Sequence, residues 1–355
     1  MNDVVIDYEK LLERPSVSFN EEVVSERFRG SSILVTGAGG SIGTELVELL
    51  AAKGAAAIVC VESHEPSLFR LGLRMREQFP ATSAILALVD ARQTDRIGRL
   101  VRDHHVDAIF HLAAYKHVPL AEDNCDQVVS VNVLSTLGLV DIAEQHGVRT
   151  FVYPSTDKAV RPPSIYGATK RITELELFRR ATKGCPVILG VARLVNVFGT
   201  AGNVIEIFAS QIRRGVPLSV TDRRMTRYWM TRREAGLLLA STACLPQIIG
   251  SYLLELGAAI PTIAIAQRLG VLLTGLEPEI SIIGLRPGER LVEELTYPYE
   301  RLEKAHLPGI QSAVSDIPLK DLRGIITSLE CAVAEGDNAT VRLLIAEATE
   351  TAIAA

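Results

Sequence analysis

Between residues 31 and 195, short apolar runs alternate with segments whose apolar residues recur at helical spacing. Such runs predict buried strands, and helical spacing predicts helices with one buried face. The predicted strands are Ser31–Val35, Ala56–Glu62, Ala84–Asp90, Ala108–Ala113 and Thr150–Ser155. The predicted helices run from Ile42 to the stop at Gly54, and around Leu68–Gln78, Asp95–His104 and Gln127–Gln145. This alternation predicts an α/β fold with a doubly wound parallel sheet over residues 31–195.

The pattern becomes less regular after Gly199, where arginines and prolines gather. We interpret residues 196–317 as a smaller substrate-binding lobe that is interleaved with the sheet domain. For residues 318–355 we predict a tail of two helices divided at Gly336-Asp337, because glycine often ends a helix and aspartate often caps the start of the next one. We interpret this tail as a packing or oligomer contact. Residues 1–30 form a predicted N-terminal arm.

One stretch without charged side chains, Ala235 to Leu254, is long enough to cross a bilayer. It contains Pro246, Gln247 and Gly250 together with several hydroxyl side chains, which a spanning helix disfavours. We therefore predict a buried helix, a turn and a strand here, and no transmembrane segment.

The composition excludes several classes of protein. With 355 residues, 48% of them hydrophobic and 22% charged, the chain is neither disordered, collagen-like nor a disulfide scaffold. The net charge of -5 argues against nucleic acid as a partner, because long polyanions are bound by basic stripes. The five cysteines are scattered without a C-x-x-C pair, and no signal-peptide pattern follows Met1. We expect a cytoplasmic protein.

A glycine-rich segment, Gly-Ala-Gly-Gly-Ser-Ile-Gly at residues 37–43, lies where the first predicted strand ends and a helix begins. Backbone N–H groups and the helix dipole can bind a pyrophosphate there. Glu62 ends the second strand, where a carboxylate would accept hydrogen bonds from the adenosine ribose, which favours NAD over NADP. Asp90 is a candidate for the adenine amino group. The alternative for both carboxylates is a solvated strand end.

Tyr166 and Lys170 are four residues apart and would share one face of a helix that begins after Pro163. A lysine ammonium near a phenol favours the phenolate, so we expect Lys170 to lower the pKa of Tyr166. Thr156, at the end of a strand, can donate or relay a proton at the same centre. The alternative, a chance Tyr-x-x-x-Lys on a solvated helix, is disfavoured by the glycine-rich turn.

With these residues the sequence resembles the extended short-chain dehydrogenase/reductase family and, within it, the polysaccharide-biosynthesis nucleotide-sugar dehydratases. The resemblance extends from about Leu11 to Thr296. The blocks that carry it are Gly37–Gly43, His111–Pro119, Asn132–Leu134, Ser155–Ala159, Tyr166–Lys170, Met225–Met230 and Leu285–Glu289. It implies a Rossmann-type sheet, a homo-oligomer, and NAD that stays bound because it is regenerated in each turnover. The implied cofactor residues are Gly37, Gly39, Gly40, Ser41, Ile42, Gly43, Glu62, Asp90, Ala91, Ala113, Tyr166 and Lys170.

The resemblance also implies roles in a 4,6-dehydration. Tyr166 would remove the hydroxyl proton on sugar carbon 4, Asp157 would protonate the departing carbon-6 hydroxyl, and Lys158 would remove the proton from carbon 5. A lysine is a base only when neutral, and an aspartic acid is an acid only if its pKa is raised. The alternative for Asp157 and Lys158 is a surface salt bridge. Lys158 together with a retained tyrosine resembles members that also invert carbon 5.

The substrate-binding residues that the resemblance implies are Lys116, Asn196, Arg227 and Arg286. Guanidinium groups suit the phosphate oxygens of a UDP-N-acetylglucosamine-like substrate, although surface solvation is the alternative, and for Arg223 and Arg224 we prefer it. Val195 stands where relatives usually have glycine, so the width of the sugar pocket is left open. His111 and His117 have no carboxylate cluster beside them, and no metal is predicted.

Two other functions are kept open. A nucleotide-sugar epimerase would use the same oxidation at carbon 4 but would need neither Asp157 nor Lys158. A catalytically silent NAD-binding scaffold or sensor is disfavoured by the intact Tyr166 and Lys170. The arm around residues 7–15 resembles the segment that joins membrane helices to the catalytic domain in longer relatives, so the chain is either a soluble member or an excised domain.

Overall fold

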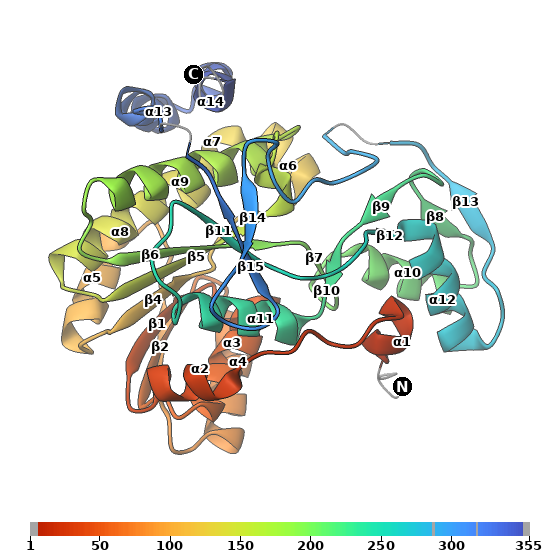
Figure 1. Ribbon diagram of the computed structural model, residues 1–355, viewed down its shortest axis with the longest axis horizontal. Coiled ribbons are helices and arrows are strands. Elements are labelled where there is room, and N and C mark those ends of the chain that lie inside the picture. Colours follow the sequence, from red (N-terminus) through yellow and green to blue (C-terminus); the bar gives the residue numbers. More distant parts are fainter. Residues whose placement is uncertain (1–5, 286–287, 317–318, 351–355) are drawn as a thin grey trace.

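A nine-stranded sheet forms the centre of the larger of two lobes (Figure 1). The structure is a computed structural model that describes residues 6–285, 288–316 and 319–350. The strands lie in the order β14-β15-β11-β6-β5-β4-β1-β2-β3, and the seven from β11 to β3 are parallel. Their bounds are β1 Ser32–Thr36, β2 Ala57–Glu62, β3 Ser83–Leu88, β4 Ala108–His111, β5 Thr150–Thr156, β6 Ile188–Leu194, β11 Gly250–Leu254, β14 Arg301–Lys304 and β15 Ile310–Val314.

This order confirms the predicted doubly wound sheet. Strands β1 to β3 follow one another toward one edge of the sheet, and β4 to β6 toward the other, so the strand order reverses between β1 and β4. In doubly wound sheets, ligands bind in the crevice at the carboxyl ends of the strands at such a point. The five predicted strands are all present, but β3 ends at Leu88 and β4 at His111. Asp90 and Ala113 therefore lie in the loops that follow these strands.

Helices cover both faces of the sheet. One face carries α2 Glu21–Phe28, α3 Ser41–Ala52, α4 Glu65–Gln78 and α11 Arg232–Thr242. The other carries α5 Thr94–Asp103, α8 Ser135–Gln145 and α9 Ile165–Thr182. Short elements near the second face are α6 Val118–Asp123, α7 Cys125–Val129, the π-helical segment η1 Ser130–Leu134 and the 3₁₀ turn η2 Asp157–Ala159. Each face buries its own apolar core, as expected for parallel strands.

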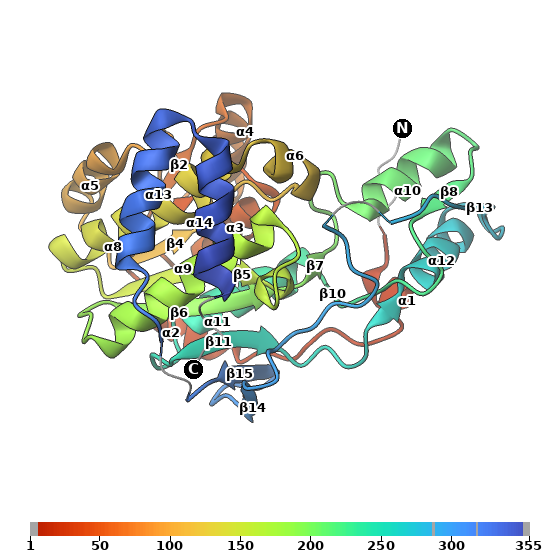
Figure 2. The ribbon, with the colours of Figure 1, turned by 90° about the horizontal axis from the view of Figure 1, so that it is seen from above.

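The smaller lobe lies beside the sheet lobe (Figure 2). It contains β7 Asn196–Val197, α10 Val204–Arg213, β8 Leu218–Val220, β9 Thr226–Arg227, β10 Trp229–Met230, β12 Ile260–Pro261, α12 Thr262–Thr274 and β13 Ile280–Ile282. The chain then returns to the sheet lobe for β14 and β15, and α11 and β11 also belong there. The two lobes are thus interleaved in sequence. The stretch from Ala235 to Leu254 forms the predicted buried helix, turn and strand.

The N-terminal arm bridges the two lobes. Its first helix, α1 Tyr8–Leu12, packs against α12 of the smaller lobe, and its second, α2, packs against α11 of the sheet lobe. Between them, Arg14 donates to the buried carboxylate of Glu234 at 2.7 and 3.0 Å, and the backbone N–H of Val17 donates to it at 2.9 Å. The arm is therefore part of the packed structure.

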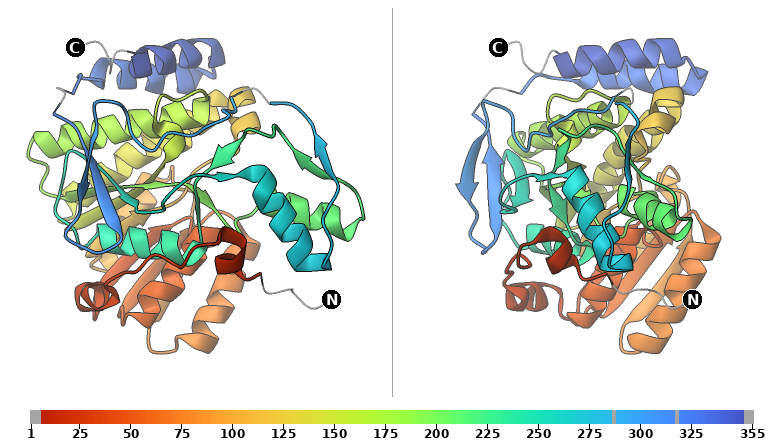
Figure 3. Two further views of the ribbon diagram at one scale, coloured as in Figure 1. Left: turned by 45° about the vertical axis from the view of Figure 1, so that its right-hand side comes forward. Right: turned by 90° about the vertical axis from the view of Figure 1, so that its right-hand side faces the viewer.

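The C-terminal tail forms the predicted helical hairpin, α13 Arg323–Glu335 and α14 Asn338–Glu350. Gly336 between them has a positive φ of 69°, a left-handed conformation that glycine adopts without strain. The hairpin packs on α7 and α9, and both views of Figure 3 place it on the side of the molecule away from α2 and α3.

One helical run within the described residues, Cys125–Gln145, is long and apolar enough to cross a membrane by length and composition alone. It consists of α7, η1 and α8, and 61% of it is buried inside the protein. Core helices of globular proteins have the same composition, so this run is weak evidence of membrane insertion.

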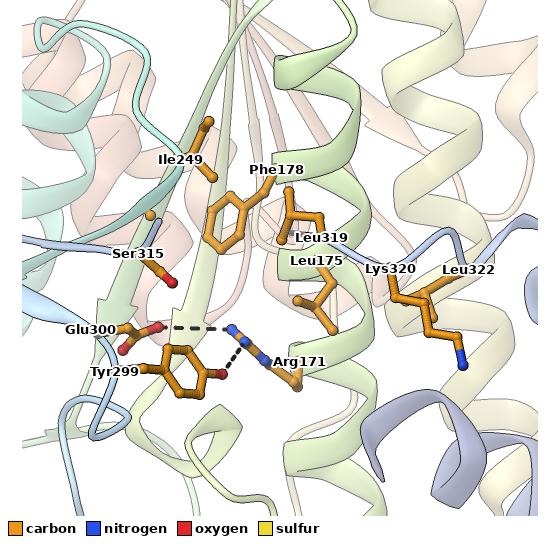
Figure 4. Close-up of a pocket in the computed structure, with 11 residues that line it drawn as sticks. Arg171, Leu175, Phe178, Ile249, Tyr299, Glu300, Ser315, Leu319, Lys320 and Leu322 are labelled. Carbon is orange, nitrogen blue, oxygen red and sulfur yellow. Dashed lines mark hydrogen bonds and ion pairs between the residues drawn. The ribbon is translucent and has the colours of Figure 1, made fainter. Parts of the chain in front are cut away.

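A buried network of charges joins α9 to β6 and to the segment before β14. All three nitrogens of the Arg193 guanidinium donate to carboxylates, at 2.8 and 2.9 Å to Glu174 and at 2.6 and 2.8 Å to Glu300. Burial raises the pKa of Glu174, but the positive charge and hydrogen bonds of Arg193 outweigh burial and lower the pKa to about 2. Arg171 points toward Tyr299 and Glu300 at the wall of a small cavity of about 20 Å³ (Figure 4). The network pairs its buried charges, as stability requires.

Candidate active site

The glycine-rich turn joins β1 to α3 and has no room for side chains. Gly37 has a φ of 64°, and a Cβ atom there would lie 2.8 Å from the backbone nitrogen of Ala113. A Cβ at Gly43 would lie 2.0 Å from the carbonyl oxygen of Gly37. The turn therefore requires glycine at these positions, and it presents free space and a helix N-terminus to the cleft.

Glu62 lies at the end of β2 against this turn. Its carboxylate accepts hydrogen bonds from the backbone N–H groups of Gly39 at 3.1 Å and of Ser63 and His64 at 2.9 Å. Asp90 is instead engaged by Arg92, which donates to both of its oxygens at 2.9 and 2.7 Å. Hydrogen bonds from Arg92 lower the pKa of Asp90. Contact between Asp90 and an adenine stays a prediction.

His111 is buried at the end of β4 and links three elements. Thr36 of β1 lies 2.7 Å from its Nδ1, and Thr136 of α8 lies 3.0 Å from its Nε2. Because Thr136 donates its own proton to the carbonyl of Asn132, it accepts from His111 Nε2. Burial, with Lys170 nearby, lowers the pKa of His111 to about 3, so the ring is neutral. Its role is to join β1, β4 and α8.

Asn132 lies in the π-helical segment η1 and fixes the loop after β4. Its Oδ1 accepts from the backbone N–H of Tyr115 at 2.9 Å, and its Nδ2 donates to the carbonyl of the same residue at 2.9 Å. Nδ2 also donates to Thr169 of α9 at 3.3 Å. Asn132 therefore supports the loop and joins it to α9.

Tyr166 and Lys170 lie on α9, which begins after the cap residue Ser164. The ammonium of Lys170 donates to the carbonyl of Pro154 at 2.9 Å and lies 4.4 Å from the ring centroid of Tyr153. Burial lowers the pKa of Lys170 to about 7. Both side chains reach the wall of the cleft at the carboxyl end of β5.

The expectation that Lys170 lowers the pKa of Tyr166 is wrong for this structure. Burial raises the pKa of the Tyr166 phenol, and the opposing effects come from Lys158 and from a hydrogen bond with Thr156. The physical reason is that Lys170 is itself deeply buried and directed to Pro154. Thr156 lies beside the phenol, and its part in proton transfer stays a prediction.

Asp157, Lys158 and Glu293 form a cluster of charges next to Tyr166. Lys158 Nζ lies 3.0 Å from Asp157 Oδ1 and 2.9 Å from Glu293 Oε1. Burial, followed by the negative charge of Glu293, raises the pKa of Asp157 to about 8. Burial lowers the pKa of Lys158, but the two carboxylates outweigh it and raise the pKa above its ordinary value. The pair is not a surface salt bridge, since the Asp157 side chain is fully buried.

Glu293 was not predicted as a site residue. It follows the Arg-Pro-Gly-Glu block in a segment without regular periodicity, and nothing in the sequence separates it from Glu294. In the structure Glu293 is buried, whereas the side chain of Glu294 is 41% exposed and pairs with Arg161 at 3.4 Å. Burial raises the pKa of Glu293, but nearby groups, of which Lys158 has the largest effect, lower it to about 2.

Asn196 and Arg227 contact Glu293 rather than an open surface. Asn196 Nδ2 donates to Glu293 Oε2 at 3.0 Å, and Arg227 Nε lies 3.2 Å from Glu293 Oε1. The other nitrogens of Arg227 donate to the carbonyls of Thr226, Arg290 and Leu291. Binding of a diphosphate by Arg227 would therefore require an exchange of these partners.

Lys116 and the loop 199–203 approach each other across the cleft. The exposed Lys116 donates to the carbonyl of Ala201 at 3.0 Å, and the backbone N–H of Ala201 donates to Ser41 Oγ at 3.1 Å. Ser41 is the first residue of α3, so this loop of the smaller lobe contacts the glycine-rich turn directly.

One cleft of about 930 Å³ brings most of the predicted residues together. Those that line it are Gly37, Gly39, Gly40, Ser41, Ile42, Gly43, Lys116, Thr156, Asp157, Lys158, Tyr166, Lys170, Asn196 and Arg227. Glu62, Asp90, Ala91 and Ala113 lie outside this lining, and Arg286 is outside the described residues. Across residues 6–285, 288–316 and 319–350, no group of three or more His, Cys, Asp or Glu side chains could hold a metal.

The sequence of this chain is similar to those of known proteins. Residues 33–315 match the family described as polysaccharide biosynthesis protein. The probable polysaccharide biosynthesis protein EpsC of Bacillus subtilis is 34% identical over 291 residues, which cover 81% of this chain and 48% of that protein. The inverting UDP-N-acetylglucosamine 4,6-dehydratase of Campylobacter jejuni is 31% identical over 294 residues, which cover 77% of this chain and 82% of that enzyme. The chain spans about half the length of the Bacillus subtilis and Staphylococcus aureus relatives.

Solved structures share the fold. Pen from Bacillus thuringiensis superposes with a TM-score of 0.72 and 25% identity, covering 81% of this chain and 89% of that one. The UDP-glucose 4-epimerase of Thermus thermophilus, solved with NAD, superposes with a TM-score of 0.64 and 22% identity, covering 75% and 90%.

Proposed function

Because this chain belongs to the polysaccharide biosynthesis protein family, we propose that it is an NAD-dependent nucleotide-sugar 4,6-dehydratase. One observation carries the proposal: the buried Asp157 and its neighbour Lys158 lie beside Tyr166, in the cleft that the glycine-rich turn also lines. An oxidation at carbon 4 needs only the tyrosine centre. An acid and a base next to it are what the elimination of water adds.

The residues at the glycine-rich turn fit NAD. Gly37, Gly39 and Gly43 leave a cradle that a Cβ atom would fill, at the N-terminus of α3, where a pyrophosphate is favoured. Glu62 lies against the turn in the position for a ribose diol. Bound there, NAD would take a hydride from sugar carbon 4 and return it to carbon 6.

Tyr166 is the group that we expect to remove the hydroxyl proton at carbon 4. The positive charge of Lys158 favours the phenolate against the effect of burial. Thr156, which gives its own proton to Asp157 at 2.9 Å, can accept the proton of the phenol. A ketone at carbon 4 then acidifies the proton on carbon 5, so that a modest base can remove it.

Asp157 is suited to be the acid of the elimination. Burial and the negative charge of Glu293 raise the pKa of Asp157, which favours the protonated carboxyl that can give its proton to the departing carbon-6 hydroxyl. An aspartate in water, with a pKa of 3.8, would be ionised. The carbon–oxygen bond breaks as the proton arrives, and water leaves.

Lys158 is the proposed base, and it must first lose its carboxylate neighbour. In the structure the ion pair with Glu293, at 2.9 Å, keeps it charged. Its side chain is 26% exposed to the cleft, so a bound sugar can draw the ammonium away from Glu293. Burial would then lower the pKa of Lys158 and favour the neutral amine that accepts the carbon-5 proton.

The substrate that we propose is a UDP-N-acetylglucosamine-like nucleotide sugar, and carbon 5 is inverted. The similarity to the inverting Campylobacter jejuni enzyme supports both points. Lys116, Asn196 and Arg227 line the part of the cleft nearest the smaller lobe, and we propose Arg286 as a further phosphate ligand.

An epimerase is the second candidate, because the Thermus thermophilus epimerase shares the fold. The two functions separate in heavy water with UDP-N-acetylglucosamine, followed by NMR. We expect loss of water and incorporation of deuterium at carbon 5. A change in ring-proton coupling without loss of water would instead establish an epimerase, and absence of turnover by protein that binds NAD would support a silent scaffold.

The preference for NAD over NADP should depend on Glu62. In the Glu62→Ala protein we expect the affinity for NAD to fall about tenfold or more, because a hydrogen bond to a charged group is lost, and the affinity for NADP to rise because its 2′-phosphate is no longer repelled. Titration calorimetry of cofactor-free protein measures both. Glu65→Ala, at an exposed carboxylate on the first turn of α4, is the matched control. An unchanged NAD/NADP ratio in Glu62→Ala would show that the carboxylate does not set the preference.

A further inference from the structure

We propose that Glu293 is a positioning residue for the elimination. Its carboxylate pairs with Lys158 in the unliganded protein, and its negative charge keeps Asp157 protonated, so that Asp157 can act as the acid. This inference rests on the proposed dehydration. The comparisons assign Glu293 no role, and the residue comes from the C-terminal part of the chain, far from the Asp157-Lys158 segment that it contacts.

Glu293 is held in place from the smaller-lobe side of the cleft. Arg227 Nε lies 3.2 Å from its Oε1, and Asn196 donates to its Oε2 at 3.0 Å. Arg227 is itself fixed by the three backbone carbonyls that it contacts. Asn196 is held independently, since its Nδ2 also donates to the carbonyl of Tyr228 at 3.1 Å, so Glu293 keeps this partner when Lys158 moves toward a sugar.

One oxygen of the buried Asp157 carboxyl lacks a donor. Its Oδ1 accepts from Thr156 at 2.9 Å and from Lys158 at 3.0 Å, but its buried Oδ2 receives no N–H or O–H donor from any described residue. A proton on Asp157 would remove this deficit, because the carboxyl could then act as a donor toward Glu293, whose Oε1 lies 2.9 Å from the same Lys158 Nζ. Two carboxylates this close do not both ionise readily, and the cations around Glu293 decide that Asp157 carries the proton.

The other charged groups around the cluster do not replace Glu293. Tyr166 faces Asp157 from α9 as a neutral phenol. Arg290, three residues before Glu293, donates to the carbonyls of Val160 and Arg161 rather than to a carboxylate of the cluster. Lys170 is directed to Pro154. Glu293 is thus the anion among them that raises the proton affinity of Asp157.

The test is the titration of the Asp157 carboxyl, followed by carbon-13 NMR in the unliganded protein and assigned with Asp157→Asn. In Glu293→Gln we expect the midpoint to fall by about 1 to 2 pH units, because one negative charge is removed. In the dehydration assay, the alkaline decline of kcat should shift to lower pH by the same amount, and KM should change less than kcat. A merely structural role would not move either titration.

Two variants keep the test decisive. Glu293→Asp retains the charge and should leave the midpoint of Asp157 closer to the wild-type value than Glu293→Gln does, and Glu294→Gln should leave it unchanged because that side chain is exposed. An unchanged midpoint in Glu293→Gln would overturn the inference even if the protein dehydrates nucleotide sugars. A shifted midpoint in a protein that dehydrates none would support the charge coupling while refuting the proposed function.

Discussion

The Tyr166→Phe protein is expected to bind NAD and nucleotide sugar as the wild type does, while its rate of dehydration falls by about 10²- to 10⁴-fold. The phenol is the group that takes the carbon-4 proton, and a positioned general base contributes a factor of this size. The substitution removes one oxygen atom and leaves the buried ring in place, so we expect no loss of folding. Stopped-flow absorbance of the reduced nicotinamide, recorded after addition of nucleotide sugar, measures the affected step directly.

Tyr115→Phe is the matched control for this experiment. Tyr115 lies at the same cleft, but it is 48% exposed and is fixed by its backbone, which exchanges hydrogen bonds with Asn132. Loss of its hydroxyl should change the rate by less than about twofold, the range of surface substitutions. Full-speed reduction of the cofactor by Tyr166→Phe would remove Tyr166 from the proposed chemistry.

The Arg193→Met protein is expected to lose about 3 to 5 kcal/mol of the free energy of unfolding, the cost of breaking a buried ion pair from one side. The guanidinium is 1% exposed and serves two carboxylates, so its removal leaves Glu174 and Glu300 close together, with Arg171 as the cation that remains beside them among the described residues. Urea unfolding followed by circular dichroism, with linear extrapolation, measures the loss.

Arg301→Ala serves as the comparison for this prediction. Arg301 pairs with Asp316 at the surface, where both side chains are more than half exposed. Ion pairs of that kind contribute about 0 to 1 kcal/mol, so the variant should unfold near the wild-type urea concentration. Equal losses in the two variants would mean that burial adds nothing to the cost of removing an arginine here.

Strands β1, β2, β4 and β5 could be predicted because they are largely buried on both faces and therefore form continuous apolar runs in the sequence. Strands β6, β14 and β15 were not predicted, and β14 shows one reason. Strand β14, Arg-Leu-Glu-Lys, lies at the edge of the sheet with four exposed residues, and only Leu302 is apolar. An exposed edge strand has no hydrophobic pattern to detect, so its hairpin with β15 follows only from the three-dimensional structure.

The candidate site was predictable where the chemistry is local in sequence. The glycines of residues 37–43 and the Tyr166/Lys170 pair have fixed spacings with a direct physical meaning. Glu293 has no such spacing, because its partners come from three separate segments. The pKa of Tyr166 was mispredicted for a related reason: its direction depends on burial and on Lys158, not on the interval to Lys170.

The arm sets a lower limit on how far this protein can be shortened. The family match begins at residue 33, yet Glu234 in the sheet lobe is 2% exposed and takes its cation, Arg14, from the arm. A chain trimmed to the matched segment would keep the carboxylate and lose the guanidinium, together with the apolar contacts of Leu11 and Leu12 with α12. We therefore expect a fragment that begins at residue 33 to be less stable than the full chain.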